Sequence, residues 1–128
     1  MLVRTEFGMT IGGYTHYPWK SAGGESVHDS GRRAFLFSLN MGEKFVPQGD
    51  DCLINCCRGW GPCFGYGSDM AISDGCNRKN SQANFPTTYN RAGGNKLDKK
   101  KDTFRMFSGG DTCHFRVEEY EVFKLWFS

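Results

Sequence analysis

The apolar residues of this chain come in short runs separated by glycines and polar clusters, and this spacing constrains the fold more than any other feature. The clearest run, Ala34-Phe-Leu-Phe-Ser-Leu-Asn40, ends at the turn signal Met41-Gly42. Because it is continuously apolar, we expect a central strand with both faces covered. The apolar residues show little helical periodicity anywhere in the chain, so any helices should be short. The chain is therefore predicted to be mainly β.

Four further segments read as strands. Met1 to Phe7 and Thr10 to His16 are β-type runs separated by Gly8-Met9, a connection that suits a tight hairpin. Cys52 to Cys57 and Met70 to Ser73 meet the same test over shorter lengths. Several short strands separated by glycine-rich turns favour a two-sheet antiparallel β-sandwich with few short helices.

The last segment, Phe115 to Phe127, alternates apolar and polar residues, but the phase of the alternation slips once. A β-bulge near Glu118 to Tyr120 accounts for the slip. A helix here would have to accommodate many aromatic and β-branched residues. The pattern therefore predicts a long closing strand that is divided into two halves.

Two stretches are poor in core residues, Lys20 to Arg33 and Asp74 to Asp102. Both are predicted to be surface loops. Almost thirty residues without regular structure is unusual in a compact domain, so the second stretch is a binding loop, is ordered by short turns, or is flexible. The length of 128 residues suits one core, and we expect residues 1–128 to form a single domain.

Charge and composition exclude some classes of function. The formal net charge of +2 lacks the positive excess of a dedicated nucleic-acid binder. No apolar stretch approaches the length of a transmembrane helix, and the first residues do not resemble a signal peptide. None of the asparagines begins a glycosylation acceptor. We therefore expect a cytoplasmic protein with reduced thiols.

The six cysteines allow a thiol-based function. Cys52 and Cys56 have the spacing of one zinc-ligand pair, but no clear second pair follows, so no metal site is predicted. Arg58 stands beside Cys57 and would favour a thiolate, which makes Cys56 and Cys57 the redox candidates. A cysteine-based redox-responsive protein is therefore one alternative, and an extracellular recognition module with disulfides is another.

The search for an enzymatic site finds no convincing constellation. The three histidines have no partners in a triad pattern, and the glycine-rich segment Gly59 to Gly65 departs from the phosphate-binding and dinucleotide-binding motifs. We therefore predict no catalytic residues and no cofactor, and favour binding over catalysis. Glu119 and Glu121 share one face of the closing strand, and we interpret them as structural or partner-facing.

Five blocks in order resemble the TLDc domain family. The blocks are Thr5-Glu-Phe-Gly-Met-Thr-Ile-Gly-Gly-Tyr14, Pro18-Trp-Lys20, Ala34-Phe-Leu-Phe-Ser-Leu39, Gly61-Pro-Cys-Phe-Gly65 with Asp69-Met-Ala-Ile72, and Phe115-Arg-Val117 through Glu119-Tyr-Glu-Val-Phe123. The resemblance implies a two-sheet sandwich flanked by short helices. It covers the later two-thirds of the family's domain, so a partial domain lacking the amino-terminal part is expected. The strand Met1 to Phe7 would then have an unpaired edge.

The resemblance also implies a function. Members of the family are associated with resistance to oxidative stress and, in several cases, with binding the peripheral sector of the vacuolar-type proton pump. This implies a non-enzymatic protein-interaction module with pump subunits as partners. The family-like positions are Gly12, Gly13, Trp19, Pro62, Phe64, Gly65, Asp69, Glu119 and Glu121. Most are expected to be scaffold, while Asp69, Glu119 and Glu121 are the candidates for partner contact.

Overall fold

The structure of the chain is a computed structural model. It describes residues 1–15, 25–26, 33–49, 54–56, 60–65, 69–73, 75–76, 80–86, 88–91, 96–97 and 101–121, with 25–26, 55–56, 60–62 and 101–102 as backbone only. The strands are β1 (Leu2–Thr5), β2 (Thr10–Tyr14), β3 (Glu25–Ser26), β4 (Phe35–Ser38), β5 (Glu43–Pro47), β6 (Asn55–Cys56), β7 (Trp60–Phe64), β8 (Met70–Ser73), β9 (Ser81–Gln82), β10 (Tyr89–Asn90), β11 (His114–Phe115) and β12 (Val117–Glu121). A short helix, α1, spans Lys101–Phe107.

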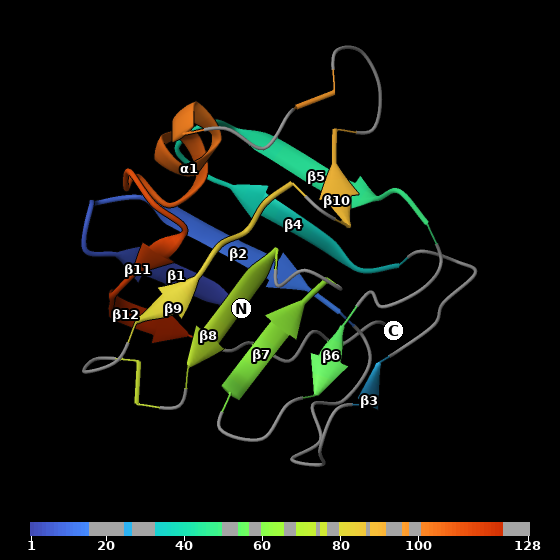
Figure 1. Cartoon of the computed structure of the whole chain (residues 1–128), viewed down its shortest axis with the longest axis horizontal. Helices are drawn as coiled ribbons and strands as arrows, with labels where there is room; N and C mark the ends of the chain where they lie inside the picture. The colour runs from blue at the N-terminus through green and yellow to red at the C-terminus, as the bar shows by residue number, and fades with distance from the viewer. Residues whose placement is uncertain are drawn as a thin grey trace, which may run out of the picture.

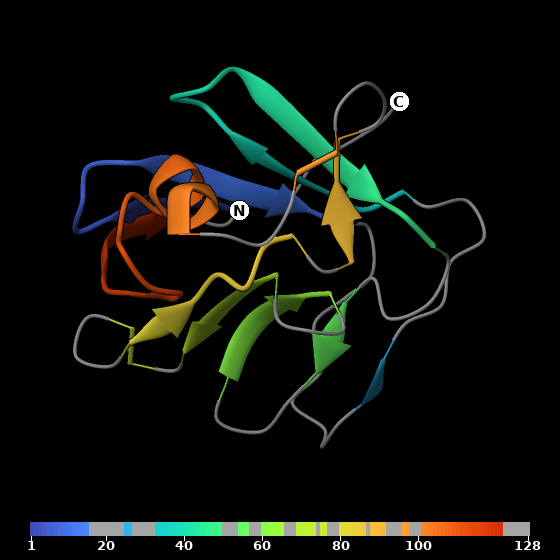
Figure 2. The same cartoon turned by 45° about the horizontal axis from the view of Figure 1, so that its top comes forward.

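The strands form two antiparallel sheets that face each other (Figure 1). The larger sheet has the order β10-β5-β4-β2-β1-β12, and the smaller has the order β11-β9-β8-β7. A separate pair, β3 and β6, lies at the lower right of Figure 1. Figure 2 shows the two layers from a second direction. This architecture confirms the predicted two-sheet antiparallel β-sandwich.

The predicted hairpin at the start of the chain is present. β1 and β2 pair antiparallel, with Val3 opposite Ile11. Gly8 in the connection has a φ of 81°, a left-handed conformation that favours glycine. However, β1 lies between β2 and β12, so the expectation of an unpaired edge for this strand is wrong. The closing strand of the chain supplies the missing neighbour.

The run around β4 is a central strand, as predicted, but its two faces differ. Leu36 and Ser38 are buried between the sheets, whereas Phe35 and Phe37 are half-buried on the outer face. The prediction that both faces are covered is therefore not met within the described residues. Phe35 stacks on Tyr14 with ring centroids 5.2 Å apart, so aromatic neighbours shield part of this outer surface.

The closing segment divides as the phase slip predicted. β11 pairs with β9 in the smaller sheet, and β12 pairs with β1 in the larger one. Arg4 lies opposite Glu119 while Thr5 lies opposite Val117, so Glu118 is the extra residue of a bulge. The chain thus crosses from one sheet to the other near this bulge. The predicted continuation of the strand beyond Glu121 lies outside the described residues.

The stretch from Asp74 to Asp102 differs from the predicted surface loop. It contributes β9 and β10, and Phe85 and Tyr89 within it are almost fully buried. The Phe85 ring lies 4.4 Å from that of Phe45, centroid to centroid. The two aromatic side chains stabilise the packing of this segment against the core, because each buries a large apolar area. The other predicted loop, Lys20 to Arg33, lies largely outside the described residues.

The core lies between the two sheets. Its largest fully buried side chains are Tyr89, Phe45, Phe64, Phe85, Phe107, Phe115, Ile11, Leu36, Ile54, Met70 and Val3. The helix α1 joins this core through Phe107, whose ring stacks on Phe85. Among the described residues, no helix is both long enough and apolar enough to span a bilayer.

Candidate partner-binding site

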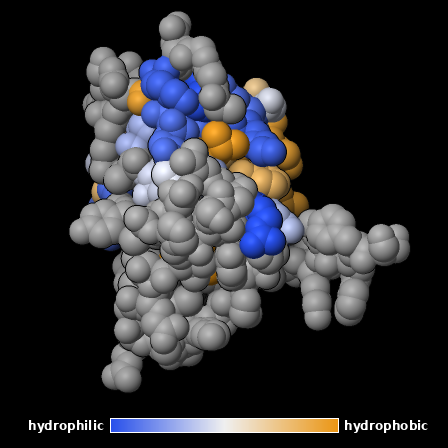
Figure 3. Space-filling view, turned by 90° about the vertical axis from the view of Figure 1, so that its right-hand side faces the viewer, coloured by the Kyte–Doolittle hydropathy of each residue, from blue (hydrophilic) through white to orange (hydrophobic). Residues whose placement is uncertain are grey.

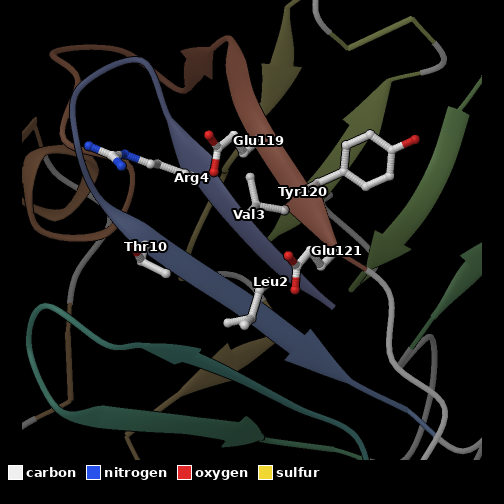
Figure 4. A pocket seen from close by; sticks show the side chains of 7 residues that line it. All are labelled: Leu2, Val3, Arg4, Thr10, Glu119, Tyr120 and Glu121. Carbon is white, nitrogen blue, oxygen red and sulfur yellow. The ribbon is translucent and has the colours of Figure 1, made fainter.

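A shallow pocket of about 260 Å³ lies on the outer face of the larger sheet, where β12 meets β1. Figure 4 shows the seven residues that line it: Leu2, Val3, Arg4, Thr10, Glu119, Tyr120 and Glu121. Two of the three residues that the family resemblance indicated for partner contact, Glu119 and Glu121, therefore line one surface pocket.

The register of the strands explains why these side chains gather. Leu2 lies opposite Glu121, and Arg4 lies opposite Glu119. Residues directly opposite each other in an antiparallel pair point to the same face of the sheet. Because Val3 points inward and is almost fully buried, its neighbours in β1 must point outward. The pocket is thus a product of strand pairing.

The site carries an excess of negative charge. Arg4 is its one basic side chain, and its Nε lies 3.7 Å from the Glu118 Oε2. Both side chains of this pair are more than half exposed, so the pair contributes little to stability. Glu119 and Glu121 are exposed as well. This part of β1 and β12 thus carries three carboxylates and one guanidinium, in a chain whose formal net charge is +2.

Tyr120 is the apolar element of the site. Its side chain is 58% exposed, which makes it one of the few large hydrophobic residues on the described surface. Figure 4 shows the ring directed away from the carboxylates of its two neighbours in β12. Tyr120 lies opposite Val3, so its ring is on the other face of the strand from the Glu119 and Glu121 carboxylates. Exposed aromatic rings are enriched in protein interfaces.

Asp69, the third candidate for partner contact, has an internal position instead. Its side chain is fully buried, and its carboxylate accepts hydrogen bonds from the backbone N–H groups of Thr88 and Tyr89, at 2.9 and 3.0 Å. Gly65 lies against it with a φ of 88°, and a Cβ there would come within 2.1 Å of the Asp69 Oδ1. The burial of Asp69 is therefore explained by a structural role, in which it holds the start of β10 against the β7–β8 turn.

The environment of Asp69 also affects Tyr89. Burial raises the pKa of the Tyr89 hydroxyl far above its ordinary value, and the electrostatic effects of Asp69 and Cys63 act in the same direction. Tyr89 therefore remains a neutral phenol at physiological pH. Its ring packs edge-on against Phe64, with centroids 6.3 Å apart. Asp69 and Tyr89 thus place polar groups inside the otherwise apolar core.

Gly13 allows the two sheets to approach closely, whereas Gly12 makes room for its neighbours within the larger sheet. A Cβ at Gly13 would lie 2.5 Å from Cζ of Phe64, and a Cβ at Gly12 would lie 2.2 Å from the carbonyl oxygen of Met1. Phe64 is almost fully buried between the two sheets. These residues are scaffold, as expected. Trp19 lies outside the described residues, and only the backbone of Pro62 is described.

Three cysteines of the described region carry reduced thiols, which no disulfide joins. Cys63 and Cys76 are buried and Cys113 is half-buried. Burial raises the pKa of the Cys76 thiol, which makes it a poor nucleophile. Of the redox candidates, Cys57 and the side chain of Cys56 lie outside the described residues. The same region contains no group of three or more potential metal-ligating side chains.

A second charged surface, over β5 and β10, contains a close ion pair. The Arg91 Nε lies 2.6 Å from the Glu43 Oε1, and both side chains are about one-third exposed. Figure 3 shows that hydrophilic residues dominate the upper part of the described surface, with apolar residues along one margin. In contrast to the β1–β12 pocket, the ion pair here neutralises its own charges.

Sequence reasoning missed five residues of the pocket, namely Leu2, Val3, Arg4, Thr10 and Tyr120. The sequence predicted a strand from Met1 to Phe7, which includes three of these residues. It contained no signal that β12, more than one hundred residues later, is the neighbouring strand. The bulge, which the sequence did indicate, sets the register between them.

Comparisons with known proteins agree with this description. A family model described as the TLDc domain matches residues 1–126, nearly the whole chain. Comparisons with curated proteins and with solved structures find no match. The match extends over both sheets, from β1 to β12, and includes the glycines, Phe64 and Asp69 that organise the core. By this match, and with the β-sandwich described above, the chain belongs to the TLDc family.

Proposed function

We propose that this chain is a non-enzymatic protein-interaction module of TLDc type, and that it uses the β1–β12 surface to bind its partner. The observation that carries the proposal is the exposed strand β12 beside an open pocket, with the Glu119 and Glu121 carboxylates on one face and the exposed Tyr120 ring on the other. Aromatic residues anchor many protein interfaces, while charged side chains at the rim select the partner and speed association.

The proposed partner is the peripheral sector of the vacuolar-type proton pump, encountered in the cytoplasm, with a consequent role in resistance to oxidative stress. Support for this partner comes from the membership of the chain in the TLDc family. The acidic character of the β1–β12 surface supports a partner that presents basic side chains at its contact surface.

A binding assay with purified components tests this function. The chain is immobilised, and the peripheral sector of the pump is passed over it at physiological ionic strength. We expect saturable binding that weakens when Glu119 and Glu121 are both replaced by glutamine. The control is Asp111→Asn, which removes an exposed carboxylate whose partner is Arg105, outside the pocket. Failure of the unmodified chain to bind would refute the proposed partner.

A further inference from the structure

The outer edge of β12 offers backbone groups for strand pairing. Within the described residues, β12 pairs with β1 alone and forms one end of the larger sheet. An edge strand presents unpaired N–H and C=O groups, and extended peptides bind to such edges by adding a strand. The direction of the backbone groups in β12 decides which residue is available.

Hydrogen bonds at the start of the chain establish that direction. The Met1 amino group donates to the Gly13 carbonyl at 2.8 Å, and the Gly13 N–H donates to the Met1 carbonyl at 3.1 Å. Backbone groups along a strand alternate between its two neighbours. Val3 therefore faces β2, whereas Leu2 and Arg4 face β12.

Because β12 pairs with β1, the direction of the backbone N–H and C=O groups in β1 also fixes their direction in β12. Glu121 and Glu119 lie opposite Leu2 and Arg4, so their backbone groups point towards β1. The N–H and C=O of Tyr120, between them, point away from β1 and towards the outer edge. At the beginning of the strand, the Val117 N–H already bonds outside this pair, to the Cys76 carbonyl at 3.4 Å. Tyr120 is thus the residue that can receive an added strand.

We propose that β12 binds an extended peptide with alternating basic residues, which pairs antiparallel with Tyr120 and extends the larger sheet. This inference rests on the proposed function and specifies the chemistry of the partner at the same site. Antiparallel pairing is the arrangement of every strand pair in this sheet.

Strand geometry specifies the pattern of the peptide. The peptide residue opposite Tyr120 exchanges two backbone hydrogen bonds with it, and its side chain lies on the same face as the tyrosine ring. The two flanking residues fall opposite Glu119 and Glu121, with their side chains on the pocket face. Lysine or arginine at these flanks would pair with the glutamates, and an apolar residue at the centre would pack on the ring. The recognised pattern is basic, apolar, basic.

Charge argues against a second copy of the chain as the added strand. Pairing two copies of β12 antiparallel about Tyr120 would place Glu119 of one copy opposite Glu121 of the other. Like charges directly opposite each other destabilise a strand pair. Charged residues on an edge strand also oppose self-association generally. The same carboxylates favour a basic strand.

Fluorescence polarisation with the full chain tests the proposal. The probe is a labelled nine-residue peptide in which lysine alternates with valine. N-methylation of the valines removes the donors that face Tyr120, and we expect it to weaken binding about tenfold, since it deletes a hydrogen bond and adds a methyl group at the contact. N-methylation of the lysines is the matched control, because their N–H groups point away from β12, and it should leave affinity within about twofold.

The same assay on protein variants tests the contribution of charge. The double variant Glu119→Gln, Glu121→Gln should bind the probe about tenfold more weakly. The control double variant Glu43→Gln, Asp111→Asn removes two carboxylates that do not line the pocket and should bind normally, with circular dichroism checking that each variant is folded. Equal effects of the two N-methylated peptides, or absence of probe binding, would overturn the proposal. Binding of the pump sector without probe binding would overturn strand addition alone, whereas probe binding without pump binding would refute only the proposed partner.

Discussion

Replacing Asp69 with asparagine should destabilise the protein more than any surface change of the same size. The Asp69 carboxylate accepts hydrogen bonds from two backbone N–H groups, those of Thr88 and Tyr89, in a fully buried site. An asparagine oxygen at the Oδ2 position still accepts from both N–H groups, but its NH2 group then takes the Oδ1 position, against the Thr88 N–H. This contact between two donors costs about 1–3 kcal/mol, and the bonds to the oxygen lose their charge assistance, at about 1 kcal/mol. Burying a neutral amide in place of a charge offsets part of this loss.

The net expectation for Asp69→Asn is a loss of about 2–3 kcal/mol in the free energy of unfolding. For a domain of this length, that corresponds to a fall of about 8–12 °C in Tm. Urea unfolding followed by circular dichroism measures the change. The matched control is Asp111→Asn, which breaks an exposed ion pair with Arg105 and should cost less than about 0.5 kcal/mol. An Asp69→Asn protein as stable as the control would refute the anchoring role of the carboxylate.

Three further predictions concern the core. Gly13→Ala should cost about 1–3 kcal/mol in urea unfolding, because its Cβ would overlap Phe64, and a loss below about 0.5 kcal/mol would show that the sheets separate easily. Burial raises the pKa of Tyr89, so above pH 10 the unfolded chain loses a proton that the folded chain retains, and the free energy of unfolding should fall by about 1.4 kcal/mol per pH unit. Tyr89→Phe should reduce the fall in the free energy of unfolding above pH 10. An unchanged dependence on pH would contradict the role of Tyr89. In timed alkylation with peptide mapping, Cys113 should react at least about tenfold faster than buried Cys76, and equal rates would show that the core opens readily.

The strands and the first hairpin were predictable because their signals are local. Alternation, apolar runs and a glycine between two β-type segments indicated β1, β2, β4 and β8 without any knowledge of neighbours. The phase slip near Glu118 indicated the bulge for the same reason, since one extra residue shifts every later side chain to the other face. These features depend on residues close together in the sequence.

The helix α1 and the buried part of the predicted loop were not predictable in this way. The helix has only seven residues and begins in a basic run that is typical of an exposed loop. The place of Phe85 and Tyr89 in the core depends on partners that lie far away in the sequence, Phe45 and Asp69. Local propensity is weak compared with the burial of such side chains.

For the candidate site, the sequence by itself determined that Glu119 and Glu121 share a face, and the family resemblance singled them out. The tertiary structure decided the rest. Pairing with β1 placed Arg4 and Leu2 beside the two glutamates, and burial placed Asp69 inside the core. Periodicity along one strand indicates which side chains point together, but the choice of neighbouring strand depends on contacts across the whole chain, which no local pattern encodes.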